Sequence, residues 1–168
     1  MANENIKPVT VRSFQKLKSL NEKITMLTAY DCSTAKYIDE CGVDSILIGD
    51  SLGMTVLGYN STINVTIEDM ITFTKAVSSG VKRALVIADM PFLSYHASKE
   101  NTVLNAGKLI QSGAKAVKLE GASDFILEEI NHLTQSGINV VGNLGFTPQY
   151  TNTIGGYFIQ GKSYENTL

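Results

Sequence analysis

Acidic side chains end three successive apolar runs of this 168-residue chain. The runs ILIGDSLG, LVIADMPF and AVKLEG carry Asp50 with Ser51, Asp89, and Lys118 with Glu120. In a strand, residues two apart point to the same side, so Lys118 and Glu120 should share a face. Parallel β/α proteins assemble their sites at the carboxyl ends of the strands. If the runs are neighbouring parallel strands, these groups should meet at one rim.

Such a cluster of acids favours a bound divalent cation. Like charges close together repel, and burial disfavours the ionised carboxylates, so an enclosed group of three acids and one lysine needs more positive charge. Oxygen ligands suit Mg²⁺, which can polarise a ketone and stabilise an enolate. Taken singly, each acid could instead cap a helix or begin a turn. Three acids after three successive strands favour the metal site.

The elements that must position these residues alternate along the chain. Short runs rich in Val, Ile and Leu predict strands at 24–29, 45–48, 84–88, 116–119 and 138–141. Helical periodicity lies between them at 33–40, 67–78, 100–112 and 124–136. Gly42, Gly80, Gly113 and Gly137 stand where helices commonly stop. The pattern is a repeated β-α unit.

Continuous apolar strands indicate a parallel sheet covered by helices, in either an open doubly wound sheet or a (β/α)8 barrel. The chain has no GxGxxG or GxxxxGK[ST] after its first strand, which favours the barrel. A complete barrel takes about 250 residues. We therefore expect an α/β fold in which residues 1–168 form one incomplete (β/α)8 barrel domain with about five of the eight strands. An amphipathic helix at 10–20 could close the bottom of the barrel.

Composition narrows the class of protein. The 14 Lys and Arg against 16 Asp and Glu, without long runs of one sign, make a nucleic-acid partner improbable. No apolar stretch reaches the roughly 18 residues of a membrane span, and the amino terminus resembles no signal peptide.

Cys32 and Cys41 lie too far apart on one predicted helix to form a disulfide, and we expect both to be small buried side chains in a reduced, cytoplasmic protein. His132 should be a surface residue, whereas His96 could line the site or belong to a helix start.

Several longer segments resemble the ketopantoate hydroxymethyltransferase family. They are LTAYD (27–31), GDSLGMTVLGY (49–59), ADMPF (88–92), AVKLEG (116–121), LGFTPQ (144–149) and GGYFIQG (155–161), in the family's order from about residue 7 to residue 162. The resemblance implies a (β/α)8 barrel that transfers a hydroxymethyl group from 5,10-methylenetetrahydrofolate to 3-methyl-2-oxobutanoate through an Mg²⁺-stabilised enolate, giving 2-dehydropantoate in pantothenate biosynthesis. Asp50, Asp89 and Glu120 would then bind Mg²⁺, while Asp50, Ser51, Asp89 and Lys118 would contact the keto acid.

The resemblance also implies what this chain lacks. The family's general base is a glutamate on a later strand, beyond Leu168, so no catalytic base is expected within the chain. Asn143 stands where the family usually has a histidine, and asparagine cannot carry a proton near neutral pH. Family members form homo-oligomers. Two alternatives stay open: another metal-enolate barrel, such as a lyase or mutase, and a non-catalytic fragment that assembles with a complete homologue.

Overall fold

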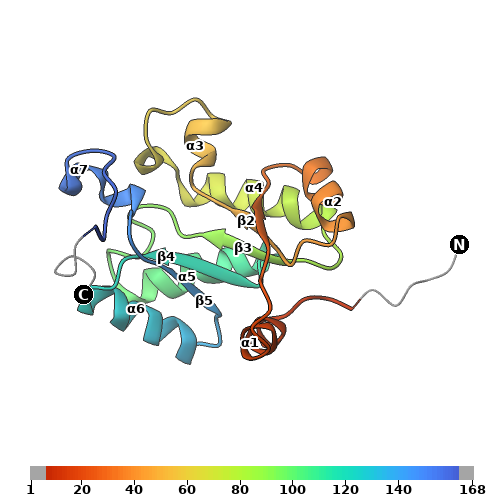
Figure 1. Ribbon diagram of the computed structural model, residues 1–168. Coiled ribbons are helices and arrows are strands. Elements are labelled where there is room, and N and C mark those ends of the chain that lie inside the picture. The colour runs from red at the N-terminus through yellow and green to blue at the C-terminus, as the bar shows by residue number, and fades with distance from the viewer. Residues whose placement is uncertain (1–6, 163–168) are drawn as a thin grey trace, which may run out of the picture.

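The computed structural model describes residues 7–162, in which one sheet of five parallel strands runs in the order β1-β2-β3-β4-β5 (Figure 1). The strands are β1 (Met26–Thr28), β2 (Ser45–Ile48), β3 (Leu85–Asp89), β4 (Ala116–Glu120) and β5 (Val140–Asn143). The main helices are α1 (Val11–Ser19), α2 (Cys32–Glu40), α4 (Ile67–Gly80), α5 (Lys99–Gln111) and α6 (Asp124–Gln135). Every predicted strand and helix is present, with ends shifted by a few residues at most.

Short elements occupy the connections that follow the carboxyl ends of β2 and β5. They are α3 (Leu52–Thr55), the 3-10 turns η1 (Thr62–Asn64) and η2 (Pro148–Tyr150), and α7 (Thr151–Ile154). The Tyr157 hydroxyl after α7 lies 3.7 Å from the Met54 sulfur of α3. The two connections therefore meet over one end of the sheet, on the side where the acids were expected.

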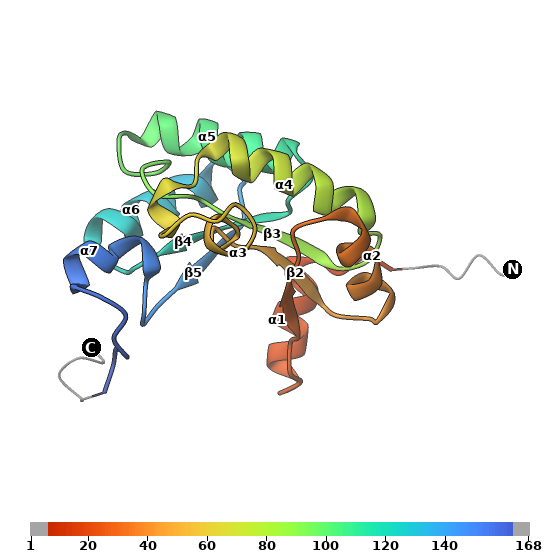
Figure 2. The same cartoon turned by 90° about the horizontal axis from the view of Figure 1, so that it is seen from above.

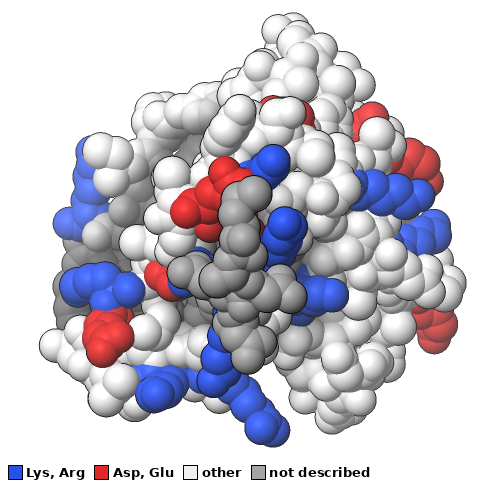
Figure 3. Space-filling model, turned by 90° about the vertical axis from the view of Figure 1, so that its right-hand side faces the viewer, with Lys and Arg blue, Asp and Glu red and all other residues white. Residues whose placement is uncertain are grey.

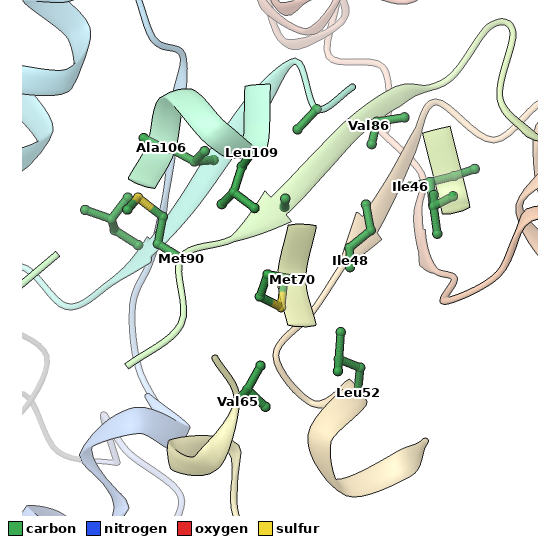
Figure 4. Packing of buried hydrophobic residues seen from close by; sticks show 14 of the residues in the cluster. Ile46, Ile48, Leu52, Val65, Met70, Val86, Met90, Ala106 and Leu109 are labelled. Atoms are coloured by element: carbon green, nitrogen blue, oxygen red, sulfur yellow. The ribbon is translucent and has the colours of Figure 1, made fainter. Parts of the chain in front are cut away.

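One face of the sheet is covered by α2, α4, α5 and α6 (Figure 2). Ile46 and Ile48 of β2 and Val86 of β3 point to this side and pack with Met70 of α4 and Leu109 of α5 (Figure 4). Burying large apolar side chains of this kind contributes about 1.5–3 kcal/mol each. This helix-covered layer is the main core.

The opposite face is covered only in part, by α1. Leu85, Ile87 and Ala116 point to this side and pack against Val11 and Phe14 of α1 and neighbouring apolar residues. Leu85 and Ala116 begin their strands, so α1 lies across the amino-terminal ends of β3 and β4. This is the position predicted for a helix that closes the bottom of a barrel.

The outer strands are less buried than the central ones. All residues of β3 are buried, whereas β1 is exposed along its whole length, with Leu27 52% exposed. The expectation that the continuous apolar strands are covered by helices is therefore wrong for β1. The cause is topological, since within residues 7–162 β1 and β5 each have a sheet neighbour on one side only.

The predicted helix-stopping glycines serve two different purposes. Gly42, Gly113 and Gly137 follow helices with positive φ angles of 82°, 115° and 81°, a conformation that glycine adopts at little cost. Gly80 has no positive φ; a Cβ there would overlap the backbone carbonyl oxygen of Cys32. Gly80 therefore allows close packing of α4 against α2.

The prediction that Cys32 and Cys41 are buried is wrong, because both are exposed. They stand at the two ends of α2, while Ala35 and Asp39 occupy the buried side of that helix.

No helix within residues 7–162 is long and apolar enough to cross a membrane. On the face drawn in Figure 3, Lys and Arg side chains lie among Asp and Glu side chains.

Candidate functional site

Lys118 lies between two carboxylates at the carboxyl ends of β3 and β4. Its Nζ is 3.0 Å from Asp89 Oδ1 and 3.7 Å from Glu120 Oε1. The strand register pairs Asp89 with Lys118, and Glu120 follows two residues later on the same side of β4. The ammonium approaches Asp89 at ion-pair distance but outside hydrogen-bond geometry, so Oδ1 keeps unused acceptor capacity.

Asp50, just after β2, joins this cluster through its backbone and its side chain. Its N–H donates to Asp89 Oδ2 at 3.1 Å, and its Oδ2 accepts a hydrogen bond of 2.8 Å from Gln149 Nε2. The backbone N–H of Gln149 donates to Glu120 Oε2 at 3.1 Å. Asp50, Asp89, Lys118 and Glu120 thus meet at one rim, as the sequence predicted.

The helix-capping alternative fails for Asp50 and Asp89. The N-caps of α3, α5 and α6 are the serines Ser51, Ser98 and Ser123. Glu120 does accept a backbone N–H in the first turn of η2, but that bond brings η2 to the cluster. The three buried acids are therefore not explained by the start of the helix that follows each strand.

Ser51 lies at the edge of the cluster, closely packed against Gly49. Its Oγ is 2.9 Å from the Tyr30 hydroxyl. A Cβ at Gly49 would stand 2.9 Å from Ser51 Oγ, 3.6 Å from Asp89 Oδ2 and 3.8 Å from the Tyr30 hydroxyl. Glycine at position 49 therefore lets one carboxylate and two hydroxyls pack closely against the backbone.

Burial dominates the electrostatics of the three acids. It raises the pKa of Asp89 to about 7. The positive charge of Lys118 lowers this pKa, whereas repulsion from Asp50 raises it further. Burial likewise raises the pKa of Asp50 and of Glu120, against hydrogen bonds from Gln149 and the charge of Lys118. Burial alone would lower the pKa of Lys118, but the surrounding carboxylates outweigh it and raise that pKa. The ammonium of Lys118 is therefore not enough to stabilise all three carboxylates in their ionised form.

The donor set fits a hard divalent cation. When all four groups are ionised, three carboxylates face one ammonium and leave an excess of two negative charges. Among residues 7–162, no three His, Cys, Asp or Glu side chains are arranged to hold a metal by themselves. Mg²⁺ usually takes only one or two carboxylates and completes its octahedron with water and substrate. This arrangement is therefore compatible with a metal site in which the substrate supplies some of the ligands.

Three residues without an assigned role in the sequence belong to the cluster. Tyr30 contacts Ser51, Gln149 contacts Asp50 and Glu120, and the Tyr95 hydroxyl donates to Gln149 Oε1 at 2.7 Å. Tyr30 and Gln149 lie in the motifs LTAYD and LGFTPQ, so the motifs marked the segments but not the contacts. Tyr95 follows ADMPF within SYHASKE and carries no comparable sequence signal.

The remaining polar candidates lie outside the cluster. His96 lies among aromatic rings, with its ring centroid 4.1 Å from that of Tyr95 and 5.5 Å from that of Phe92, and burial lowers its pKa. It therefore belongs to an aromatic cluster and not to a helix start, whose cap is Ser98. His132 on α6 is only partly exposed. The side chain of Asn143, at the end of β5, donates to the Phe146 carbonyl oxygen at 3.4 Å.

Comparison with known proteins gives one consistent family. The model of a family described as ketopantoate hydroxymethyltransferase matches residues 8–168. A 3-methyl-2-oxobutanoate hydroxymethyltransferase of Acetivibrio thermocellus is 58% identical over 93% of this chain and 55% of its own length. One of Bacillus cereus is 52% identical over 94% of this chain and 56% of its own. The chain spans a little more than half the length of these curated relatives.

Solved structures with the same fold are distant in sequence. A phosphonopyruvate hydrolase in complex with oxalate and Mg²⁺ superimposes with a TM-score of 0.65 at 14% identity, over 78% of this chain and 50% of the other. An oxaloacetate acetylhydrolase gives a TM-score of 0.59 at 15% identity, over 81% and 53%. Each of these two proteins is about twice as long as its region that matches this chain. The fold seen here is that of an incomplete (β/α) barrel.

Proposed function

Because this chain belongs to the ketopantoate hydroxymethyltransferase family, we propose that it contributes the metal-binding and keto-acid-binding part of a 3-methyl-2-oxobutanoate hydroxymethyltransferase. The reaction would transfer a hydroxymethyl group from 5,10-methylenetetrahydrofolate to 3-methyl-2-oxobutanoate and give 2-dehydropantoate. The observation that carries the proposal is the cluster of Asp50, Asp89 and Glu120 around Lys118 at one rim. Homo-oligomeric assembly, a cytoplasmic location and the absence of nucleic-acid and membrane partners stay predictions.

In this proposal Asp50, Asp89 and Glu120 hold Mg²⁺, directly or through water. When bound, the ion would supply Lewis-acid polarisation of the keto acid's carbonyl group. The excess of negative charge in the cluster supports a cation at this place, and the raised pKa of Asp89 indicates that its ionised form needs one. Among the described residues, Glu120 forms an ion pair with Lys118 alone, and Asp50 forms none, although the charge of Lys118 acts on it.

The chain's own polar groups would orient the substrate. Lys118 is the cation at the rim and would neutralise negative charge on a substrate oxygen. The Ser51 hydroxyl, which contacts the Tyr30 hydroxyl beside Gly49, would donate a further hydrogen bond. The base that takes the C3 proton would be the glutamate that the family resemblance assigns beyond Leu168.

The test is the partial reaction that precedes transfer. In heavy water with Mg²⁺, the full-length protein should exchange the C3 proton of 3-methyl-2-oxobutanoate for deuterium, followed by proton NMR. Asp89→Ala should abolish the exchange, since it removes a carboxylate of the metal site. Glu128→Gln is the matched control, because Glu128 is an acid 67% exposed on α6. Exchange at the wild-type rate in Asp89→Ala would show that Asp89 is not part of the metal site.

The folate co-substrate needs its own measurement. Other metal-enolate barrels would catalyse proton exchange but would not consume 5,10-methylenetetrahydrofolate. Incubation with the keto acid and the folate should therefore form 2-dehydropantoate and tetrahydrofolate in equal amounts. Exchange without consumption of the folate would favour a lyase or mutase instead.

A further inference from the structure

Gln149 connects the ends of three strands from a position after the fifth. Its side-chain Nε2 donates to Asp50 Oδ2 at 2.8 Å and to the Met90 carbonyl oxygen at 2.9 Å, while its backbone N–H donates to Glu120 Oε2. Asp50 follows β2, Met90 follows β3, and Glu120 is the last residue of β4. Gln149 is 3% exposed, so water does not compete for these bonds.

The chemistry of the partners determines which way the Gln149 amide points. An ionised carboxylate and a backbone carbonyl accept hydrogen bonds and donate none, so the NH₂ group must face Asp50 and Met90. The amide oxygen then faces Tyr95, whose hydroxyl donates to it at 2.7 Å. Tyr95 is fully buried, and its hydroxyl is the donor to that oxygen within the described structure.

We propose that Tyr95 and Gln149 are positioning residues for the carboxylate site: Tyr95 orients the Gln149 amide, and Gln149 holds Asp50 and Glu120 in place for the metal ion. The proposal rests on the metal-binding function proposed above. Gln149 contacts one oxygen of each carboxylate, which leaves the second oxygen of Asp50 and of Glu120 outside this clamp. Hydrogen-bonded partners of this kind commonly tune metal affinity by about 10–100-fold.

The first test measures metal affinity without turnover. Mn²⁺ serves as a paramagnetic probe, and its binding to the full-length protein is followed by electron paramagnetic resonance. Tyr95→Phe removes only the hydroxyl, and Gln149→Met removes the amide at similar side-chain length while keeping the backbone bond to Glu120. Each variant should bind Mn²⁺ about tenfold more weakly than the wild type. The double variant should bind no more weakly than Gln149→Met, because Tyr95 acts through the amide.

The control separates positioning from a general loss of stability. Thr102→Val on α5 also removes a buried hydroxyl, one that donates to the Ser98 carbonyl oxygen away from the carboxylates. It should leave the Mn²⁺ affinity unchanged even where it lowers the unfolding temperature. Independent, additive effects of the Tyr95 and Gln149 substitutions, or wild-type affinity in Gln149→Met, would overturn the proposal.

A metal-free measurement keeps this inference distinct from the proposed function. In the wild type, the side-chain NH₂ protons of Gln149 should exchange slowly with solvent in a nitrogen-15 NMR experiment, because both are held by buried acceptors. Tyr95→Phe should speed their exchange at least tenfold, and unchanged exchange would show that Tyr95 does not orient the amide. A wild-type protein that exchanges slowly but binds no Mn²⁺ would overturn the metal function and the role of the pair toward the ion, leaving only the orientation of the amide.

Discussion

Asp89 is the carboxylate in the least favourable electrostatic environment of the site. Its side chain is buried, Asp50 adds repulsion, and Lys118 compensates only part of the cost. The same residue accepts the backbone N–H of Asp50 and so links β3 to the connection after β2. One side chain thus joins two strands and also supplies a metal ligand in the proposed function.

The raised pKa of Asp89 predicts how the metal-free protein responds to pH. The unfolded chain releases this proton near the ordinary value of 3.8, whereas the folded protein holds it until about 7. Between these values the folded state binds more protons, so the free energy of unfolding should fall as the pH rises from about 4 to about 7. Urea unfolding in the presence of a chelator measures this trend.

Asp89→Asn is the matched variant for the pH prediction, because asparagine has a similar shape and does not titrate in this range. Its unfolding free energy should fall less steeply over the same pH interval than that of the wild type. Added Mg²⁺ should restore stability to the wild type at the upper end of the interval. Parallel pH curves for the two proteins would show that Asp89 keeps an ordinary pKa.

At the scale of elements, α2 is anchored by a carboxylate in its last turn. Asp39 accepts backbone N–H groups of Lys82 at 2.8 Å, Arg83 at 3.1 Å and Ala84 at 2.6 Å. These three residues lead into β3, which carries Asp89 at its far end. Asp39 therefore holds the start of the strand whose end bears the site.

Replacing Asp39 by Ala should destabilise the fold strongly. The substitution leaves backbone donors without a partner beside a buried strand, which costs about 1–3 kcal/mol for each group that water cannot reach. We expect a loss of about 2–4 kcal/mol in the free energy of urea unfolding, allowing for groups that become hydrated. Asp31→Ala is the control, since Asp31 caps the exposed start of the same helix and its loss should destabilise the fold much less. Equal losses in the two variants would contradict the anchoring role.

At the scale of the whole molecule, the sheet formed by the described residues has two open edges. The exposed strand β1 presents Met26 and Leu27, and Leu144 beyond β5 is 71% exposed. This chain covers 55% of the length of one relative, and in a (β/α)8 barrel further strands lie between the fifth and the first. The described half therefore exposes apolar surface that a complete barrel would cover.

An exposed apolar strand edge predicts association of the 168-residue chain with itself. Unpaired backbone groups and apolar side chains on an edge strand are a template for pairing with another chain. Sedimentation velocity should show species larger than the monomer as the concentration rises, and Leu27→Lys should reduce them. Leu104→Lys is the control, because Leu104 is 63% exposed on α5, away from the edge. Equal reduction by both variants would locate the association elsewhere.

The alternation of elements could be predicted because it is written in local patterns. Apolar runs of strand length and helical periodicity marked β2, β3, α4 and α5 to within a residue or two. The short elements α3 and η2 gave no such signal, since a single turn is too short to show a period. The exposure of Cys32 was also missed, because it depends on which side of α2 meets the sheet.

The sequence by itself determined the repeated β-α order, the family motifs, and the placement of an acid at the carboxyl end of each of three strands. Parallel strands put their carboxyl ends at one edge, so local patterns already implied that Asp50, Asp89 and Glu120 would gather there. Only the tertiary structure decided which groups touch those acids. Gln149 reaches Asp50 across 99 residues of sequence, and Tyr95 lies 54 residues from the amide it contacts. Such contacts depend on how distant loops pack, which no local period records.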